Sequence, residues 1–240
     1  MNAATALRLI KLNRLFYQTF ADQFSATRQR LQPGVKRALA ILPRSARILD
    51  LGCGNGELWR TLAKEGHAGL YVGLDFSAEL LRAAQHTVQP GSPARFLQAD
   101  LTTPGWDAAF ADESFDFVLA FAVLHHLPQA EIRRATLHTV RRLLQPQGRF
   151  IHSHWQFLNS PRLTARIQPW ETIDIAADQV DASDYLLDWR RGGYGLRYVH
   201  HFSDQELREL AYESGFTVLE TYHSDGENSQ LGLYHIWGPV

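Results

Sequence analysis

Residues 48–56 read Ile-Leu-Asp-Leu-Gly-Cys-Gly-Asn-Gly, an apolar run that contains an acid and continues into three glycines at every second position. The apolar run predicts a buried β-strand, and the glycines predict a tight loop after it. Glycine has no Cβ, so it tolerates positive φ and lets the backbone approach a ligand closely. This stretch therefore predicts a binding loop at the end of the first strand of an α/β fold.

A second acid follows the next apolar run. Residues 69–74 read Gly-Leu-Tyr-Val-Gly-Leu, and Asp75 comes directly after them. In nucleotide-binding folds, a carboxylate about 20 residues beyond the glycines accepts hydrogen bonds from ribose hydroxyls. The two strand ends together indicate a nucleoside ligand more strongly than the glycines alone would.

Composition narrows the class of protein. The 240 residues are 45% hydrophobic and 20% charged, which is typical of a globular domain with a full core. Cys53 is the only cysteine, so an intramolecular disulfide and a multi-cysteine zinc site are excluded, and we expect no metal site and a reducing, cytoplasmic location. No run approaches the roughly 18 apolar residues that span a bilayer, so we expect no membrane segment.

Charge is unevenly distributed although the net charge is only -1. Residues 1–47 carry nine Lys and Arg against one Asp, and residues 171–188 carry six acids and no base. The basic segment either binds phosphates or is a solvated surface that partly pairs with the acidic segment. Residues 7–16 are basic and amphipathic, as targeting peptides are, but lack their serine content. We expect a helix that buries Leu9, Leu12, Phe16 and Phe20.

Strands and helices alternate along the chain, which predicts a parallel sheet with helices on both faces and ligands at the carboxyl ends of its strands. The expected strands are 47–51, 70–74, 95–97, 115–121 and 149–153, and the expected helices are 57–65, 78–85 and 129–144. We divide the single domain, 1–240, into N-terminal helices (1–45), a binding core (46–154), an irregular insertion or lid (155–196), and a C-terminal helix with two antiparallel strands (197–240).

The spacing Asp-x-Gly-x-Gly-x-Gly resembles motif I of the class I S-adenosylmethionine-dependent methyltransferases. This resemblance implies a doubly wound, mostly parallel, seven-stranded Rossmann-like sheet with an insertion after strand five. It implies S-adenosyl-L-methionine as cofactor and S-adenosyl-L-homocysteine as product. Asp50 and the glycines would hold the aminoacyl end, Asp75 the ribose, Phe76 one face of the adenine and Asp100 its amino group. The implied cofactor residues are Asp50, Gly52, Cys53, Gly54, Gly56, Asp75, Phe76, Asp100, Leu101 and Phe121.

Two alternatives accompany this interpretation. A glycine-rich turn also occurs in flavodoxin-like domains that do not bind this cofactor. Cys53 is better explained as a small buried residue of the loop than as a nucleophile.

Residues 121–128 follow the fourth expected strand and read Phe-Ala-Val-Leu-His-His-Leu-Pro. This position faces the transferable methyl group in the resembling enzymes, and histidine can accept a proton or donate a hydrogen bond near neutral pH. Adjacent residues leaving a strand usually face opposite ways, so only one of His125 and His126 should point into the cleft. The alternative for either is a structural histidine bonded to backbone.

Other segments resemble the tRNA wobble-uridine carboxymethyl methyltransferases. Tyr17 and residues 24–28 look like that family's Y-x-x-x-A-x-x-F-S-x-T-R, His125 to Arg134 is similar to H-H-x-S-x-x-E-R-R, and residues 197–202 are similar to R-Y-Y-H-x-F. The resemblance implies esterification of a carboxymethyl group on the wobble uridine of tRNA, with a small zinc-binding activator subunit as partner. The acceptor residues it implies are Arg28, His125, His126, Arg133, Arg134, Arg197 and His200, with Arg28 and Arg197 as first choices.

The chain departs from that pattern at residues 128–130, which replace a serine-bearing turn, and at residues 153–162 after the fifth strand. Two other functions therefore stay open. One is a small-molecule O- or N-methyltransferase with a histidine base and the insertion as a lid. The other is a cofactor-binding module without catalysis. The basic face of the helix over 129–144 is expected to be mainly solvated.

Overall fold

The structure, a computed structural model, describes residues 1–21, 23 and 30–240. Arg28 and the rest of the 24–28 motif lie outside the described residues. Within the described chain no helix has the length and apolar character to span a bilayer.

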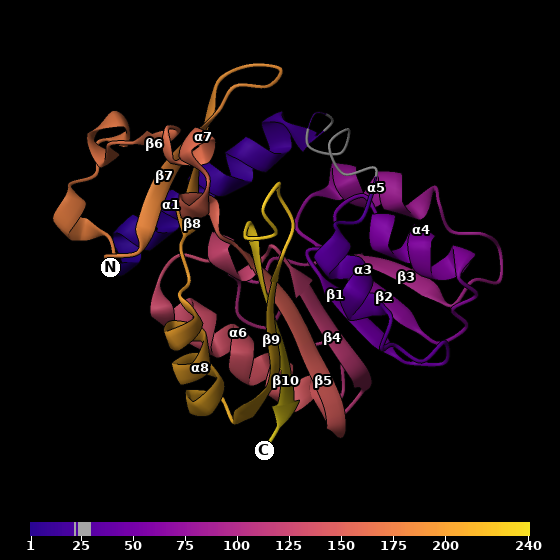
Figure 1. Ribbon diagram of the computed structural model, residues 1–240. Helices are drawn as coiled ribbons and strands as arrows, with labels where there is room; N and C mark the ends of the chain where they lie inside the picture. Colours follow the sequence, from indigo (N-terminus) through magenta and orange to yellow (C-terminus); the bar gives the residue numbers. More distant parts are fainter. Residues whose placement is uncertain (22, 24–29) are drawn as a thin grey trace.

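A seven-stranded sheet forms the centre of the protein, with the order β3-β2-β1-β4-β5-β10-β9 (Figure 1). Neighbouring strands pair in parallel from β3 to β5, and β10 and β9 complete the sheet as an antiparallel pair. This confirms the predicted fold class. The strands are β1 (Ile48–Leu51), β2 (Tyr71–Asp75), β3 (Ala94–Gln98), β4 (Phe115–Phe121), β5 (Leu144–Trp155), β9 (Phe216–Ser224) and β10 (Gly232–Pro239).

Helices cover both faces of this sheet because successive strand residues point to opposite faces. Leu49 and Leu51 of β1 pack on one face in a core with residues 137–143 and 207–211, whereas Ile48 packs on the other face in a second core with residues 35–39, 58–62 and 81–84. The helices are α1 (Ala3–Thr19), α3 (Pro33–Leu39), α4 (Glu57–Lys64), α5 (Ala78–Gln85), α6 (Ala130–Leu143), α7 (Pro161–Thr164) and α8 (Asp204–Glu213). Ser77 and Ser203 cap α5 and α8 through their side chains, as residues of this type do at helix starts.

The segment after β5 contains a second, three-stranded antiparallel sheet, so the expectation of an irregular insertion was wrong for this part. Its strands are β6 (Ile167–Gln168), β7 (Asp184–Trp189) and β8 (Gly195–His200), and the division expected at 196 falls inside β8. Leu186 packs against α1 on one face, and its neighbour Leu187 packs against Phe157 on the other. A strand that is buried on both faces lacks the apolar-polar alternation that reveals strands in sequence.

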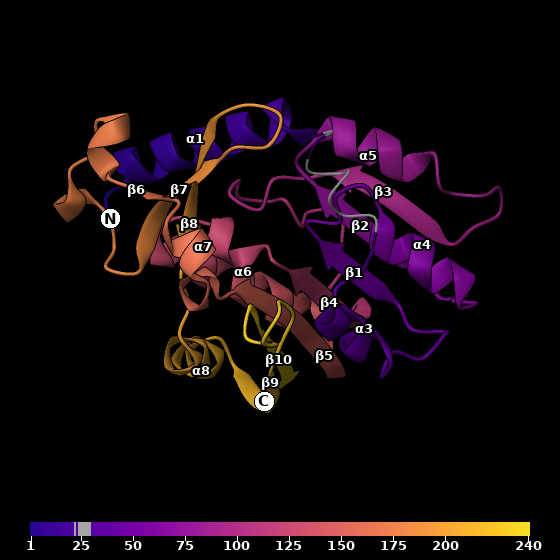
Figure 2. The same ribbon diagram turned by 45° about the horizontal axis from the view of Figure 1, so that its top comes forward.

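Helix α1 lies across this small sheet (Figure 2). Leu9, Phe16 and Phe20 are buried, and Leu12 packs against the same core as Leu9, which confirms the predicted apolar stripe. The Arg8 side chain donates to the carbonyl oxygens of residues 173 and 174. Here α1 therefore contacts the backbone of the acidic segment.

Candidate functional site

The glycine loop has the backbone conformation that its sequence predicts. Gly52, Gly54 and Gly56 have φ values of 69°, 55° and 75°, which side chains rarely tolerate. A Cβ added to Gly52 would lie 2.5 Å from Val123, whereas one added to Gly54 would meet no atom within 4 Å. Gly52 is therefore required by the packing of the protein, and Gly54 borders open space.

Two buried carboxyl groups flank this loop. The Tyr71 hydroxyl donates to Asp50 over 2.5 Å, and burial raises the pKa of Asp50 to about 7 despite that hydrogen bond. Asp75 accepts hydrogen bonds from the backbone N–H of Gly54 and of Ser77, each over 2.9 Å. Burial raises the pKa of Asp75, while these two hydrogen bonds oppose the shift. Asp75 thus ties the end of β2 to the loop after β1.

A cavity of about 380 Å³ opens at the carboxyl ends of the strands, within the range of small-molecule sites. Its lining includes the loop after β1 at one end, and residues from α1, β5 and β8. The predicted cofactor residues that line it are Asp50, Gly52, Cys53, Gly54, Asp75, Phe76, Asp100, Leu101 and Phe121.

Gly56 is the predicted cofactor residue that does not line the cavity. It begins α4, and an added Cβ would lie 2.9 Å from Ala84 of α5, so close helix packing requires glycine there. Cys53 packs in the core, and burial raises the pKa of its thiol. A protonated thiol is a poor nucleophile, in agreement with the structural interpretation of this residue.

Asp100 has more protein partners than the sequence suggested. It accepts hydrogen bonds from the backbone N–H and the hydroxyl of Thr102, and it pairs with Arg14 over 2.5 Å. Arg14 comes from α1 and also lines the cavity. No sequence signal identified Arg14, because its contact with the end of β3 depends on how α1 packs.

His125 and His126 are both among the residues that line the cavity. They lie on one 3₁₀ turn, Leu124–His126, and their ring centroids are 4.4 Å apart. His126 Nδ1 is 3.2 Å from the carbonyl oxygen of Tyr198, and Nε2 is 2.6 Å from the hydroxyl of Tyr17. Because a carbonyl oxygen only accepts, Nδ1 donates, and Nε2 of the neutral ring then accepts from Tyr17.

Arg197 of β8 lines the same cavity and is 8% exposed. Its guanidinium carbon lies 4.8 Å from the ring centroid of Trp155, 5.3 Å from that of Phe16 and 5.8 Å from that of Trp189. Cation–π contacts with three rings hold this charge in an environment that contains little water. The sequence identified Arg197 but not its aromatic partners, which come from β5, α1 and β7.

Three residues that the resemblance implied as acceptor contacts lie elsewhere. Arg133 is buried and donates to the carbonyl of Leu127 and to the hydroxyl of Tyr198. Arg134 pairs with Glu131 and Glu213 at the surface of α6. His200 is buried between Asp184 and Glu206. Buried charged groups require partners, and Arg133 and His200 have structural ones.

His154, which the sequence analysis did not select, lines the cavity at the end of β5. Its Nε2 lies 2.7 Å from Nδ1 of His152, and one ring nitrogen donates to the other. Burial lowers the pKa of both rings, so the pair is neutral at physiological pH. Both residues are buried, on adjacent positions of one face of β5. The His-x-His spacing was the sequence signal that could have indicated this pair.

His200 gives a prediction about stability. Burial opposes its protonation, but the hydrogen bonds to Asp184 and Glu206 outweigh this and raise its pKa. A raised pKa contributes stability that is present below the unfolded value and is lost as the pH rises through the folded value. We therefore expect His200→Gln to lower the free energy of unfolding by about 1 kcal/mol or more near pH 6, and by less near pH 9.

The control for this prediction is His201→Gln. Burial lowers the pKa of His201, so protonation of this residue favours the unfolded chain. Its contribution to stability should fall as the pH is lowered, with the sign opposite to that of His200. Urea unfolding of both variants at several pH values measures the two trends, and equal pH dependence in both would contradict the assignment.

Comparisons with known proteins agree with this geometry. Residues 48–148 match a family model described as a methyltransferase domain. A protein of Encephalitozoon cuniculi described as a methyltransferase is 31% identical, over 91% of this chain and 92% of its own length. The tRNA (carboxymethyluridine(34)-5-O)-methyltransferase of Schizosaccharomyces pombe is 26% identical, over 85% of this chain and 88% of its own.

A solved structure has the same fold. The 1,6-didemethyltoxoflavin-N1-methyltransferase of Burkholderia thailandensis, with bound S-adenosylhomocysteine, superposes with a TM-score of 0.67 at 19% identity. The match covers 100% of this chain and 92% of the Burkholderia chain.

The residues of the cavity fit this cofactor. A Cβ at Gly54 would point into open space, which leaves the backbone accessible to a ligand, and the Asp75 carboxylate borders the same cavity. The chain therefore belongs to the class I S-adenosylmethionine-dependent methyltransferases.

Proposed function

We propose that this enzyme methylates the carboxylate of a carboxymethyl group on the wobble uridine of tRNA. The observation that carries the proposal is Arg197, a buried cation that borders the cavity and is surrounded by aromatic rings. A planar guanidinium matches a carboxylate in both charge and geometry. The Schizosaccharomyces pombe relative, whose name specifies carboxymethyluridine, supports the same acceptor.

We assign the cofactor to the part of the cavity at the ends of β1, β2 and β3. The backbone at Gly54 and the Asp50 carboxyl would hold the aminoacyl end, and Asp75 would hold the ribose. Phe76 and Leu101 would contact the adenine. Bound S-adenosylmethionine supplies an electrophilic methyl group on a positively charged sulfur. Asp100 would approach the adenine amino group while it keeps its ion pair with Arg14.

Asp75→Ala tests this assignment. The substitution removes the acceptor of the ribose hydroxyls and the two hydrogen bonds that hold Gly54 and Ser77. We expect S-adenosylhomocysteine to bind more weakly by about 1 to 3 kcal/mol, as measured by isothermal titration calorimetry. Asp116→Ala is the control, because Asp116 pairs with Arg47 and does not line the cavity. Wild-type affinity for Asp75→Ala would refute the assignment.

The acceptor belongs beside β4, β5 and β8 in this proposal. A carboxylate is already a nucleophile, so it needs orientation and loss of water rather than a strong base. Arg197 would hold one carboxylate oxygen, and the rings of Phe16 and Trp155 would exclude water from the other. Nε2 of His126 already accepts a hydrogen bond from the Tyr17 hydroxyl, so it is not available to take a proton from the acceptor. This supports a carboxylate acceptor, which has no proton to lose.

A second candidate, methylation of an O–H or N–H group on a small molecule, is supported by His154. This ring is neutral and lines the cavity, and its Nδ1 has no hydrogen-bond partner among the described residues. A ring nitrogen without a partner can accept the proton that a hydroxyl or amine loses on methylation.

Methyl transfer from labelled S-adenosylmethionine distinguishes the two candidates. The acceptors are bulk tRNA, the same tRNA after mild alkali has hydrolysed its methyl esters, and a metabolite extract. The proposal expects label mainly in the alkali-treated tRNA, and release of that label as methanol in a second alkaline step. Label only in the extract would exclude the tRNA acceptor. The activator subunit stays a prediction, so the enzyme is assayed both alone and as purified from its native cells.

A further inference from the structure

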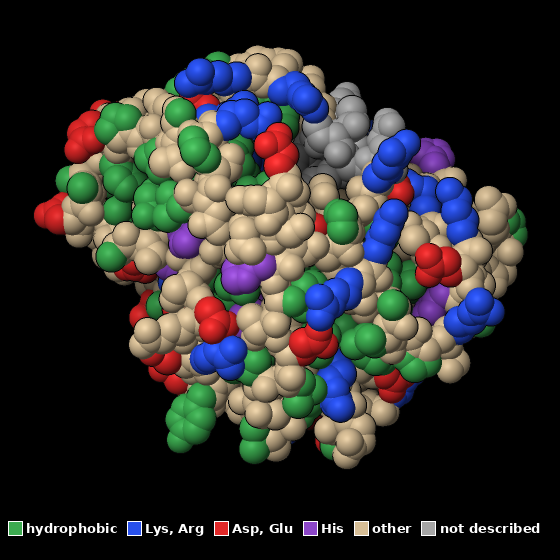
Figure 3. Space-filling view, in the orientation of Figure 1, with side chains coloured by type: hydrophobic (Ala, Val, Ile, Leu, Met, Phe, Trp, Pro, Cys, Tyr) green, Lys and Arg blue, Asp and Glu red, His purple; other side chains and the backbone are tan. Residues whose placement is uncertain are grey.

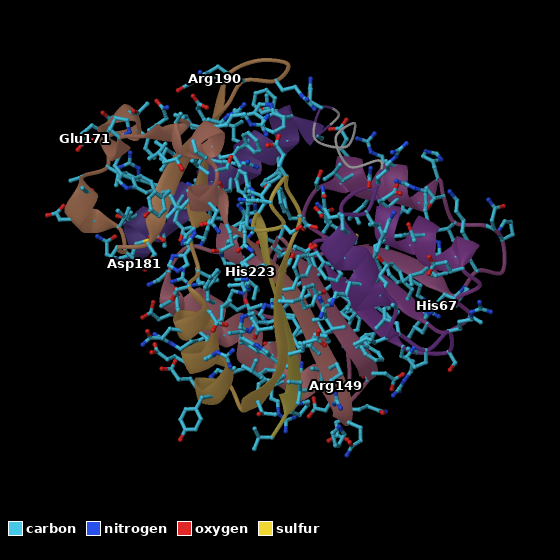
Figure 4. The ribbon with its side chains drawn as sticks, viewed as in Figure 1. His67, Arg149, Glu171, Asp181, Arg190 and His223 are labelled. Atoms are coloured by element: carbon cyan, nitrogen blue, oxygen red, sulfur yellow. The ribbon has the colours of Figure 1, made fainter. Side chains whose placement is uncertain are left out.

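The hairpin between β7 and β8 ends in an exposed tip, residues 190–194, with the sequence Arg-Arg-Gly-Gly-Tyr. Tyr194 is 62% exposed, and so is the side chain of Arg190. The tip rises from the small sheet near the end of α1 (Figures 1 and 2), and Arg190 is labelled beside it in Figure 4. A tyrosine that is this exposed contributes little to folding, so its packing does not explain it.

Contacts on both sides of the tip fix its position. Arg190 donates from Nε to the buried carboxylate of Asp188 over 2.8 Å, and the Trp189 indole donates to the carbonyl of Arg191 over 2.5 Å. A Cβ at Gly193 would lie 3.2 Å from the ring of Phe20. The backbone of the tip therefore lies beside Phe20 at the end of α1, and the side chains of Arg191 and Tyr194 are exposed.

The tip is continuous with the cavity that contains Arg197. Trp189 pairs with Gly195 across the hairpin, and Gly195 and Arg197 lie on the same face of β8. The ring of Phe16 lies 3.2 Å from the Cβ position of Gly195 and 5.3 Å from the Arg197 guanidinium. One wall of aromatic rings, with Trp155 at the cavity and Trp189 toward the tip, thus joins the two places.

The chemistry of the tip combines cations with an exposed aromatic ring. Figure 3 shows Lys and Arg side chains over this end of the molecule. Arginine neutralises phosphates, and an exposed aromatic ring stacks on nucleobases of any sequence. An acidic protein surface is an alternative partner. It would pair with the guanidinium groups, but it would give Tyr194 no contact that needs an aromatic ring.

We propose that this tip binds the single-stranded RNA next to the nucleotide whose base enters the cavity. Arg191 contacts a phosphate and Tyr194 stacks on a neighbouring base, while Arg190, paired with Asp188, supports the tip. The inference rests on the proposed tRNA acceptor and extends it, because it names the part of the protein that holds the rest of the anticodon loop.

The experiment compares Arg191→Ser/Tyr194→Ser with the wild-type protein. The matched control is Arg95→Ser/Tyr212→Ser, which removes an exposed arginine and an exposed tyrosine from β3 and α8. The ligand is an anticodon stem-loop RNA with carboxymethyluridine at the wobble position. Fluorescence anisotropy gives its affinity at several salt concentrations, and labelled cofactor gives kcat/KM for the stem-loop and for the free nucleoside.

We expect the tip variant to bind the stem-loop about 10-fold more weakly or worse, with a shallower salt dependence, and to methylate the nucleoside at the wild-type rate. The control should match the wild type in every measurement. Tyr194→Phe should keep the RNA affinity that Tyr194→Ser loses. Wild-type RNA affinity in the tip variant would overturn the inference.

An equal loss of affinity for polyglutamate in the tip variant, with no effect of Tyr194→Ser on RNA, would also overturn it, in favour of a general anion-binding patch. If the wild-type protein methylates neither the stem-loop nor the nucleoside, the proposed acceptor is wrong. The binding measurements still decide the role of the tip in that case, so the two failures are distinguishable.

Discussion

Gly54→Val is expected to abolish binding of S-adenosylmethionine while the protein stays folded. A side chain at this position meets no protein atom within 4 Å, and Gly54 lines the cavity, so the side chain would occupy space that we assign to the ligand. Its φ of 55° adds strain of about 1 to 2 kcal/mol, which a domain of this size tolerates. We expect the affinity for S-adenosylhomocysteine to fall more than about 100-fold, since a branched side chain would block the close approach of the ligand to the backbone of the loop.

Gly91→Val is the matched control for this substitution. Gly91 also has positive φ, 80°, and a side chain there also meets no atom within 4 Å, but it does not line the cavity. Both variants should lose similar stability in thermal unfolding, and only Gly54→Val should lose affinity in calorimetry. Equal affinities of the two variants would contradict the assignment of the loop.

Arg197→Ala should have the largest effect on turnover. Removing the guanidinium leaves an acceptor carboxylate without a partner in a site that contains little water, which costs about 2 to 5 kcal/mol. We therefore expect kcat/KM for the carboxymethyluridine acceptor to fall about 100-fold or more, with nearly unchanged affinity for S-adenosylhomocysteine. Arg197→Lys should recover only part of the activity, because an ammonium group cannot bind a carboxylate through two parallel hydrogen bonds.

Arg37→Ala is the control for Arg197. Arg37 also lies over an aromatic ring, 4.0 Å from the ring centroid of Tyr222, but it is exposed and does not line the cavity. Its removal should leave kcat/KM unchanged in the same steady-state assay. Loss of cofactor affinity in Arg197→Ala would show that this residue belongs to the cofactor end of the cavity.

The glycine loop and the strand-end acids, where we propose that the cofactor binds, were predictable from sequence because their determinants are local. The positive φ values at Gly52, Gly54 and Gly56 and the acids at two strand ends all follow from residues close together in the chain. The same locality holds for the alternating strands and helices of the main sheet, and for the Ser77 cap.

The acceptor end was harder to predict because distant segments form it. His125 and His126 share a 3₁₀ turn, so the alternation expected of a strand did not apply. Arg133 and His200 were selected by motif, but their side chains have buried partners that only the tertiary structure brings to them. Arg14 and the rings around Arg197 carried no local signal, and the His-x-His spacing was the signal available for His154.

Helix α1 contributes to both ends of the cavity. Arg14 reaches the Asp100 carboxylate, and Tyr17, on the next turn of the same helix face, reaches His126. A rigid helix transmits a shift at one of these residues to the other. Occupancy at one end thus changes the free energy of occupancy at the other, and by thermodynamic linkage the effect is reciprocal. We therefore expect the affinity for the cofactor to change when the acceptor is bound.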